Sequence, residues 1–242
     1  MLPIIFINLR KDTARRSSIE NELNRYDLPH SRFEAILWKE LPQDQKSLFY
    51  SEALNSEQHH QPLIDGEKGC YASHLSIWSN LLKSEHDAII VLEDDVKISS
   101  AFKSVIDKLD LNSFEWDMIK LIGRQNEKVH SRKIISGDYS LIKYRKIPSM
   151  TAGYIINKAG AAKLCKTRIP FGRPIDLDLR HWWENDLHIY GIYPSLISLG
   201  TASFSSSIGL QNSSAKGWVR LKKFQIKFIY TIKNFFKSLN KE

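Results

Sequence analysis

Two kinds of apolar pattern alternate along the first 165 residues. Short continuous apolar runs predict strands at residues 4–9, 33–37, 88–92, 116–122 and 153–156. Apolar residues at three- and four-residue steps predict one helix from Asp12 or Thr13 to Tyr26, and others at residues 66–84, 101–109 and 158–165. Because strands alternate with helices, we expect an α/β fold around a mainly parallel sheet.

Two longer stretches interrupt this alternation. Residues 38–65 are polar, and we interpret them as a long irregular connection of the kind that often forms a binding loop or lid. Residues 124–149 are basic and polar with few core signals, a pattern that favours a hairpin.

Residues 89–95 read Ile-Ile-Val-Leu-Glu-Asp-Asp, an apolar run that ends in three carboxylates. The run predicts a strand buried on both faces. Ligands of open α/β sheets bind at the carboxyl ends of strands, which is where Glu93, Asp94 and Asp95 fall. Adjacent carboxylates repel one another and resist dehydration, and a divalent cation with oxygen ligands relieves both costs. The triplet is therefore either a site for Mg²⁺ or Mn²⁺ or an acidic turn in solvent.

The loop after the first strand contains no glycine, which argues against a dinucleotide fingerprint or a P-loop. If a nucleotide binds, its phosphates must be neutralised in another way, and a cation held by the triplet would do so. Arg15 and Arg16 are candidates to add positive charge, although a solvated helix face explains at least one of them.

Most of the positive charge lies at one end of the chain. The net charge is +8, of which residues 216–242 carry +7 and residues 1–215 carry +1. The body is nearly neutral and shows no recognition motif, so we expect no nucleic-acid partner. Cys70 and Cys165 are too few for a disulfide framework and lack zinc-site spacing, and the apolar N-terminal stretch is too short for a signal peptide. We therefore expect a cytoplasmic protein.

The basic tail has a helical apolar pattern of its own. Large apolar residues recur at three- and four-residue steps, at Trp218, Leu221, Phe224, Phe228, Ile232, Phe235, Phe236 and Leu239. The pattern predicts a helix lying on an anionic membrane surface, where each basic residue contributes about 1 kcal/mol. The alternative is a helix that packs its aromatic face on the body or on another subunit. We divide the chain into a domain at 1–215 and a basic amphipathic tail at 216–242. Through this tail we expect the protein to be peripheral on the inner face of the cytoplasmic membrane.

Other polar residues are candidates for chemistry. His74 lies on a predicted helix, where a satisfied core histidine is the default and a site-lining residue the alternative. For Asp176 and Asp178, N-capping explains one, and a general base that takes a proton from a bound hydroxyl is the other role. His181 and His188 are candidate metal ligands only if the fold returns their segment to the triplet.

Four blocks of residues stand in order along the chain. They are Asn8-Leu9 with Arg15-Arg16, Gly66-Glu67-Lys68-Gly69-Cys70-Tyr71-Ala72-Ser73-His74 with Trp78, Leu92-Glu93-Asp94-Asp95, and Thr151-Ala152-Gly153-Tyr154. Over roughly residues 1–210 the chain resembles glycosyltransferase family 25. This family builds bacterial lipooligosaccharide and lipopolysaccharide and includes collagen galactosyltransferase relatives. The glycine-to-histidine block and the triplet are the most specific parts of the resemblance.

The resemblance implies a single GT-A-like domain with a Rossmann-like sheet, in which one half binds a nucleotide sugar and a second half binds the acceptor. It implies that the triplet acts as an Asp-X-Asp motif, with Mn²⁺ (or Mg²⁺) on the diphosphate of a UDP-sugar. By position, Glu93 and Asp95 face ribose and metal, and Asp94 lies between them. The remaining positions implied near the nucleotide are Asn8, Arg15, Arg16 and His74.

The chain also departs from the family. Members tend to show Ala-Val-Asp-Gly after the second strand, whereas this chain has Ala35-Ile36-Leu37-Trp38. The missing aspartate weakens or reshapes nucleotide recognition, and Trp38 either stacks on the base or belongs to the core. Ser206-Ser207-Ile208 resembles a late serine-rich block of the family.

The function that we expect is an inverting, metal-dependent transfer of a hexose, galactose or glucose, from a UDP-sugar. The acceptor is a hydroxyl of a lipid-linked lipooligosaccharide or lipopolysaccharide core, and Asp176, with Asp178 behind it, is the catalytic base candidate. The alternative is a catalytically silent nucleotide-sugar-binding protein of the same fold.

Overall fold

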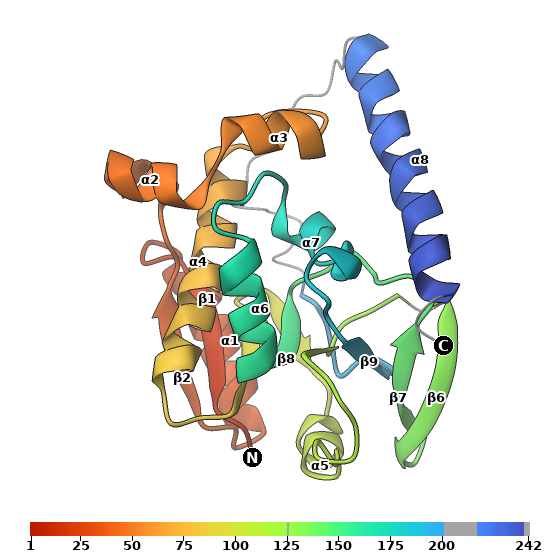
Figure 1. Ribbon diagram of the computed structural model, residues 1–242. Coiled ribbons are helices and arrows are strands. Elements are labelled where there is room, and N and C mark those ends of the chain that lie inside the picture. Colours follow the sequence, from red (N-terminus) through yellow and green to blue (C-terminus); the bar gives the residue numbers. More distant parts are fainter. Residues whose placement is uncertain (125, 201–216, 240–242) are drawn as a thin grey trace.

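The computed structural model describes residues 1–124, 126–200 and 217–239, and its centre is an eight-stranded sheet (Figure 1). Across the sheet the strands are β2 (His30–Glu34), β1 (Ile4–Asn8), β3 (Ala88–Glu93), β8 (Gly153–Asn157), β5 (Met118–Lys120), β9 (Ile189–Tyr193), β7 (Tyr139–Tyr144) and β6 (Val129–Ser136). A second, two-stranded sheet pairs β4 (Val96–Ile98) with β10 (Ile197–Leu199).

Six of the eight strands in the central sheet run in one direction, and only β8 and β7 run against them. The prediction of an α/β fold with a mainly parallel sheet is therefore confirmed. Because β1, β3 and β5 are parallel, their carboxyl ends meet at one edge of the sheet. The start of the antiparallel strand β8 lies at the same edge, where Gly153 pairs with Leu92.

Helices cover both faces of the sheet. The helices are α1 (Thr13–Arg25), α2 (Gln43–Phe49), α3 (Glu52–Gln58), α4 (Asp65–Lys83), α5 (Phe102–Asp107), α6 (Lys158–Thr167), α7 (Ile175–Asp178) and α8 (Gly217–Leu239). The short 3₁₀ segments are Trp38–Glu40 and Trp182–Glu184. One apolar core lies between the sheet and α1 with α5, and the other lies between the sheet and α4 with α6 and α7.

The strand β3 joins the two cores. Ile90 and Leu92 pack in the first core, whereas Ile89 and Val91 pack in the second. These four side chains are at most 2% exposed, so the prediction of a strand buried on both faces is confirmed. The carboxylates that follow are consequently held at the end of a rigid central strand.

Residues 38–65 do not form the irregular connection that the sequence pattern predicts. They contain α2 and α3, and α3 is capped by the Ser51 side chain, which accepts a hydrogen bond from the Leu54 amide. The pattern missed these helices because α2 has no buried residue and α3 buries only Asn55. The Asn55 side chain instead donates to the carbonyl of Gly172, far away in sequence.

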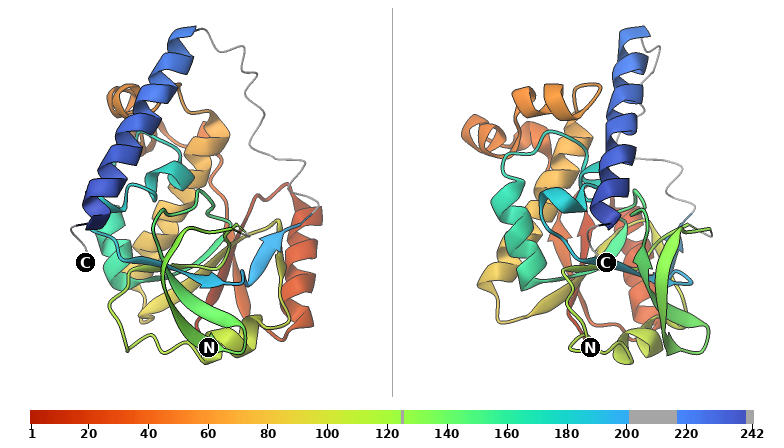
Figure 2. Two further views of the ribbon diagram at one scale, coloured as in Figure 1. Left: turned by 90° about the vertical axis from the view of Figure 1, so that its right-hand side faces the viewer. Right: turned by 45° about the vertical axis from the view of Figure 1, so that its right-hand side comes forward.

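The hairpin predicted within residues 124–149 is present as β6 and β7, which turn at Gly137 with φ +54°. The second strand begins earlier than predicted, at His30 rather than residue 33. Three strands were not predicted at all, namely β4, β9 and β10. The amphipathic C-terminal helix is present as α8, which lies along the outside of the domain (Figure 2).

Candidate active site

The carboxyl ends of β1 and β3 bring the acidic triplet beside the first helix. Asn8, the last residue of β1, is 1% exposed and donates a 2.7 Å hydrogen bond to Oδ2 of Asp94. Nε of Arg15 lies 3.2 Å from the other oxygen of Asp94. Burial raises the pKa of Asp94, while Asn8 and Arg15 act in the opposite direction. Asp94 is thus turned toward the protein and held from two sides.

Asp95 is held from one side only. An amino group of Arg15 lies 2.7 Å from its Oδ2, whereas Oδ1 is buried and has no hydrogen-bond partner among the described residues. The Arg16 side chain instead forms an ion pair with Glu20, one turn further along α1, at 2.9 Å. Of the two predicted arginines, the structure therefore brings only Arg15 to the triplet.

Glu93, the last residue of β3, is the third member of the triplet. The hydroxyl of Thr151 donates to its Oε1 at 3.0 Å. Burial, followed by repulsion from Asp95, raises the pKa of Glu93 to about 7. A single arginine thus faces three carboxyls, which leaves negative charge and one unsatisfied carboxylate oxygen at this edge.

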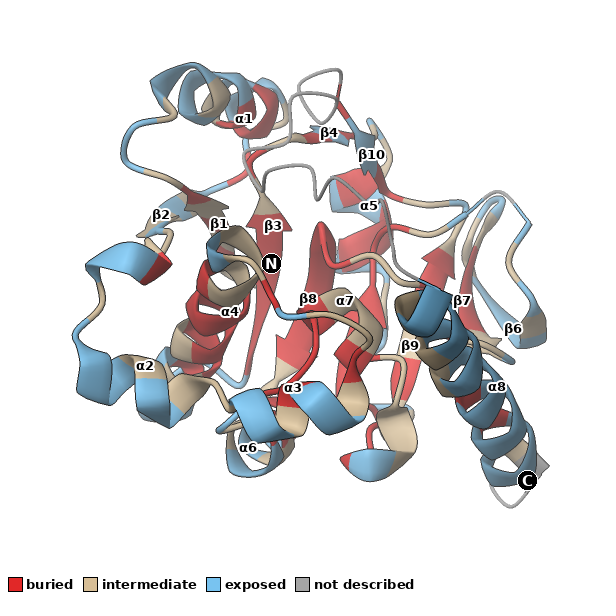
Figure 3. Ribbon diagram, turned by 90° about the horizontal axis from the view of Figure 1, so that it is seen from above, coloured by how far each residue is buried: buried red, intermediate tan, exposed pale blue. Residues whose placement is uncertain are grey.

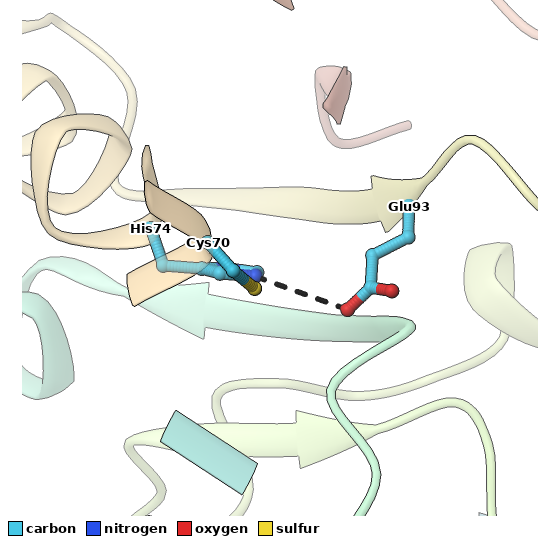
Figure 4. A group of neighbouring side chains, drawn as sticks. All are labelled: Cys70, His74 and Glu93. Carbon is cyan, nitrogen blue, oxygen red and sulfur yellow. Dashed lines mark ion pairs between the residues drawn. The ribbon is translucent and has the colours of Figure 1, made fainter. Parts of the chain in front are cut away.

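His74 approaches Glu93 from α4. Its Nε2 lies 4.0 Å from Oε1 of Glu93 (Figure 4). Its Nδ1 lies 2.6 Å from the hydroxyl of Tyr154, which accepts a hydrogen bond from Trp78. Burial lowers the pKa of His74 to about 3, so the imidazole is neutral near pH 7 and its contact with Glu93 is not an ion pair. His74 is a core histidine by burial, but it is not the fully satisfied one of the default interpretation, because its Nε2 has no hydrogen-bond partner among the described residues. Its role beside the nucleotide stays a prediction.

Close packing of α4 explains why the glycine-to-histidine block is needed here. A Cβ at Gly69 would lie 2.4 Å from the carbonyl oxygen of Ile36, so only glycine permits this approach. One turn later, the hydroxyl of Ser73 donates to the Gly69 carbonyl and accepts from the Ile36 amide. These contacts fix the segment after β2 and set the position of His74 beside β3.

Two groups of side chains at this edge could hold a cation. The ligand atoms of Cys70, His74 and Glu93 lie within 4.8 Å of one another (Figure 4). Burial raises the pKa of the Cys70 thiol well above its usual value, which keeps it protonated and a poor ligand. Glu93 and Asp95 offer carboxylate oxygens, which are the ligands that Mn²⁺ and Mg²⁺ prefer, and these two residues fit a hard divalent cation better.

Lys120, at the end of β5, is a site residue that the sequence analysis did not identify. It is 2% exposed, and its Nζ donates to the carbonyl of Pro148 at 2.9 Å and to the carbonyl of Met150. These bonds hold the loop that carries Thr151 against Glu93. Burial lowers the pKa of Lys120 to about 7. A lysine at the end of a three-residue buried strand was the signal available in the sequence.

The two acids of α7 have different surroundings. Asp178 is 2% exposed and lies 2.5 Å from Nε of Arg173 and 3.1 Å from Nε of Arg168, and it also accepts a hydrogen bond from Tyr71. Asp176 is half-buried, and burial raises its pKa although Lys120 and Arg180 act against this. Asp176 therefore retains a basic carboxyl near Lys120, whereas Asp178 is fully engaged.

The structure does not bring His188 to the triplet. His188 precedes β9 at the opposite edge of the sheet, where its amide donates to Oδ2 of Asp117 at 2.7 Å. Since β9 and β5 are parallel, the segment before β9 cannot reach the carboxyl ends of β1 and β3. The predicted metal role of His188 is therefore corrected.

A cavity of about 660 Å³ lies at the same edge of the sheet as His188, between Pro3, Trp116 and Lys158. None of the predicted site residues lines it.

Trp38 belongs to the core. It is 6% exposed and packs edge-on against Tyr50 and Phe171, which leaves it unable to stack on a nucleotide base without repacking. The serine-rich block Ser206-Ser207-Ile208 lies outside the described residues.

α8 contacts the body through a narrow face. Tyr230 and Asn234 are 5% and 8% exposed, and Asn234 donates to the carbonyl of Arg145 and accepts from Trp182. Most of the helix is exposed in Figure 3. The exposed apolar side chains are Trp218, Leu221, Phe224, Phe228, Ile229, Ile232, Phe235 and Phe236, between 41% and 75% exposed. The aromatic face therefore does not pack on the body within the described residues. Among the described residues, no helix is both long enough and apolar enough to span a bilayer.

Comparison with known proteins identifies the family. Residues 1–178 match the family model described as glycosyltransferase family 25 (LPS biosynthesis protein). The human procollagen galactosyltransferase 2 is 29% identical over 190 residues, which cover 72% of this chain and 29% of the human protein. A glycosyltransferase 25 family member of Drosophila pseudoobscura pseudoobscura is 29% identical over 72% of this chain and 28% of that protein. The chain thus spans less than a third of the length of these relatives.

Among solved structures, a glycosyltransferase involved in the glycosylation of the major capsid of PBCV-1 is 13% identical, with a TM-score of 0.31, over 66% of this chain and 62% of that one. The match to the family model covers well over half of the residues. This chain belongs to glycosyltransferase family 25.

Proposed function

We propose that this protein transfers a hexose, galactose or glucose, from a UDP-sugar to a hydroxyl of a lipooligosaccharide or lipopolysaccharide core, with inversion at the sugar. The observation that carries the proposal is the triplet at the carboxyl end of β3, where, among the described residues, a single arginine faces three carboxyls and one oxygen of Asp95 has no hydrogen-bond partner. The galactosyltransferase relatives support the hexose, and the family description supports the acceptor. Inversion rests on the family resemblance.

Glu93 and Asp95 would hold Mn²⁺ or Mg²⁺, which when bound neutralises the diphosphate that leaves the sugar. Asp94 has a positioning role, because Asn8 and Arg15 already occupy both of its oxygens. Thr151 orients the carboxyl of Glu93 through its hydrogen bond, and the neutral imidazole of His74 lies beside that carboxyl without a hydrogen bond to it. Lys120 fixes the loop that carries Thr151.

Asp176 is the base in this proposal. Its carboxylate accepts the proton of the acceptor hydroxyl as that oxygen attacks the sugar. A pKa raised by burial makes the carboxylate a stronger base than one in water. Asp178, two residues later, anchors α7 through Arg168 and Arg173 and so fixes the position of Asp176.

The test is a donor screen with UDP-galactose, UDP-glucose and their N-acetyl forms, with Mn²⁺ and with a chelator. We expect hydrolysis or transfer with one hexose donor, lost on chelation. Turnover that survives chelation would overturn the metal role. Asp176→Asn should lower transfer about 1,000-fold while leaving UDP binding within about twofold. Unchanged transfer in that variant would remove Asp176 as the base.

The second candidate is a nucleotide-sugar-binding protein without turnover. The observation that favours it is Leu37, which stands where family members have an aspartate, together with the burial of Trp38 in the core. Isothermal titration with UDP, with and without Mn²⁺, separates the two candidates when combined with the donor screen. Binding of UDP without any hydrolysis or transfer favours the second candidate.

We also propose that α8 docks on an anionic membrane surface. Its described residues contain six basic side chains and no acidic one. On a helical wheel, Lys222, Lys233 and Lys237 lie on one flank of the exposed apolar face, and Arg220, Lys223 and Lys227 lie on the other. An apolar face bordered by cations on both sides is suited to an interface with anionic headgroups.

Vesicle sedimentation tests this docking. Phe228→Asp should reduce binding to vesicles of phosphatidylglycerol and phosphatidylethanolamine about tenfold, because it places a charge in the apolar face. Ile134→Asp is the matched control, since Ile134 is a 76% exposed apolar residue on β6. Equal binding by both variants and the unmodified protein would exclude α8 as the docking element.

A further inference from the structure

Cationic side chains from separate segments gather where α8 meets the body. They are Arg124 after β5, Lys128 before β6, Lys146 after β7, Arg180 after α7, and Lys227 on α8; we call these five residues the cationic cluster. Burial lowers the pKa of Lys146 most, and repulsion from the other four cations lowers it further. The segments come together only in the folded chain, so no local sequence pattern marks the cluster.

Tyr230 of α8 lies between two members of the cluster. The guanidinium carbon of Arg180 lies 4.4 Å from the centre of the Tyr230 ring, and Nζ of Lys146 lies 5.5 Å from it. A cation over an aromatic face is favourable, but two like charges on one ring repel each other. The ring therefore holds two cations near each other without neutralising either.

The cluster lacks a carboxylate partner. Within the described part of the chain, none of its five members forms an ion pair. Nε of Arg180 is buried and has no hydrogen-bond partner there. The buried arginines Arg168 and Arg173 differ, because both are paired with Asp178 and Glu184. Arg180 and Lys146 are half-buried, whereas Arg124, Lys128 and Lys227 are exposed. A group of cations without carboxylate partners on one surface attracts an anionic ligand.

The position of the cluster shows which ligand would reach it. Arg180 follows Asp176 by four residues, and its amide donates to the carbonyl of Leu177 on α7 at 3.3 Å, so the cluster borders the proposed base. The triplet on β3 has its own arginine, Arg15, which belongs to a different helix. The cluster is therefore suited to an anion on the acceptor side of the site.

We propose that the cationic cluster binds a phosphate group carried by the acceptor saccharide, beside the hydroxyl that Asp176 deprotonates. This inference rests on the proposed transferase function and names the class of acceptor, a phosphorylated sugar. α8 contributes Lys227 directly and holds Arg180 and Lys146 through Tyr230. The helix that docks on the membrane thus also forms one wall of the acceptor site.

The experiment is isothermal titration of the full chain with galactose 6-phosphate, with galactose as the neutral match. Saturating UDP and Mn²⁺ are present, so that phosphate cannot enter the donor site. We expect the phosphorylated sugar to bind at least about tenfold more tightly, as for one charge-assisted hydrogen bond. Lys146→Gln should remove about tenfold of this affinity, and Lys146→Arg should retain it. Lys166→Gln, which removes an exposed charge on α6, is the control and should bind as the unmodified protein does.

Equal affinity for galactose and galactose 6-phosphate would overturn the proposal, as would an equal loss in the Lys166→Gln control. Phosphatidylglycerol vesicles distinguish the other source of phosphate. If they displace galactose 6-phosphate, and Lys146→Gln weakens vesicle binding equally, the cluster binds lipid headgroups and the acceptor assignment is wrong. Failure of the transferase function itself is seen separately, as absence of UDP–Mn²⁺ binding or of turnover in the unmodified protein.

Discussion

At the edge of the sheet where β5 begins, the buried carboxylate of Asp117 accepts from Nζ of Lys163 at 2.7 Å and from the amide of His188 at 2.7 Å. At the opposite edge, three carboxyls share Arg15, and burial raises the pKa of Glu93 to about 7. Both edges bury acids from the same sheet. Among the described residues, the edge with Asp117 satisfies its acid, whereas at the edge with the triplet one oxygen of Asp95 has no hydrogen-bond partner. We call these the satisfied edge and the unsatisfied edge, and a ligand would complete the second.

The largest expected effect is at the unsatisfied edge. Asp95→Ala should lower kcat/KM for metal-dependent transfer about 100-fold, close to 2.7 kcal/mol, because it removes the carboxylate with the open oxygen. Tm should stay within about 2 °C, because the contact of Asp95 with Arg15 is lost but the repulsion between Asp95 and its neighbouring carboxyls is relieved. Initial rates and calorimetry measure the two quantities. A loss of less than about tenfold contradicts the metal role.

The satisfied edge should respond in the opposite way. Asp117→Asn should lower the free energy of unfolding by about 3 kcal/mol, because it leaves Lys163 without its buried partner. Urea unfolding measures this loss. Turnover per folded molecule should not change, since Asp117 lies away from the triplet. A variant that is stable but inactive would show that the two edges do not divide the roles in this way.

The pH dependence of stability separates two residues within the unsatisfied edge. The pKa of His74 falls from 6.5 to about 3 on folding, so acidification below pH 6.5 destabilises the protein. The pKa of Glu93 rises from 4.5 to about 7, so acidification between pH 7 and pH 4.5 stabilises it. Between pH 4.5 and 6.5 the two slopes oppose each other, each at most about 1.4 kcal/mol per pH unit.

Single variants uncover each slope in metal-free protein. Relative to the unmodified protein, Glu93→Gln should make the free energy of unfolding fall more steeply as pH drops from 6.3 to 5, and His74→Gln should make it fall less steeply, because His59, His181 and the other groups titrate alike in all three proteins. Urea unfolding at the two pH values gives the difference in slope. The same slope in both variants would refute the opposed titration of His74 and Glu93.

The smallest expected effect is at Arg15, and the neighbouring Arg16 serves as its comparison. Arg15→Gln should raise KM for the donor about tenfold, because Asp94 and Asp95 then repel each other without a shared cation. Arg16→Gln is the matched control, since Arg16 contacts Glu20 on the exposed side of α1. Equal KM values for the two variants would remove Arg15 from the site.

The sequence predicted the parts of the fold that depend on strong local patterns. The apolar run before Glu93 predicted β3, and the spacing of large residues predicted α4 and α8. It failed where long-range contacts decide the structure. α2 and α3 have almost no buried residues, and β4 and β10 are three residues each and pair only with one another.

The candidate site was also predicted only in part from the sequence. The pattern of the strand placed the triplet at a strand end, whereas Asn8 was placed by the family resemblance and Arg15 was not told apart from Arg16. Asp176 and Asp178 could not be told apart, because the arginines that engage Asp178 follow a separate helix. His188 was assigned wrongly, since the direction of β9 decides which edge it reaches. The cationic cluster was missed because its members come from separate segments.

Binding of Mn²⁺ to the unsatisfied edge is the most direct test of the account. Electron paramagnetic resonance measures free Mn²⁺ as the metal is titrated into the full chain with UDP, for the unmodified protein and for Asp95→Ala. The account predicts one bound Mn²⁺ per chain in the unmodified protein and its loss in Asp95→Ala, with Asp117→Asn binding as the unmodified protein does. Equal Mn²⁺ binding by the unmodified protein and Asp95→Ala would contradict the account.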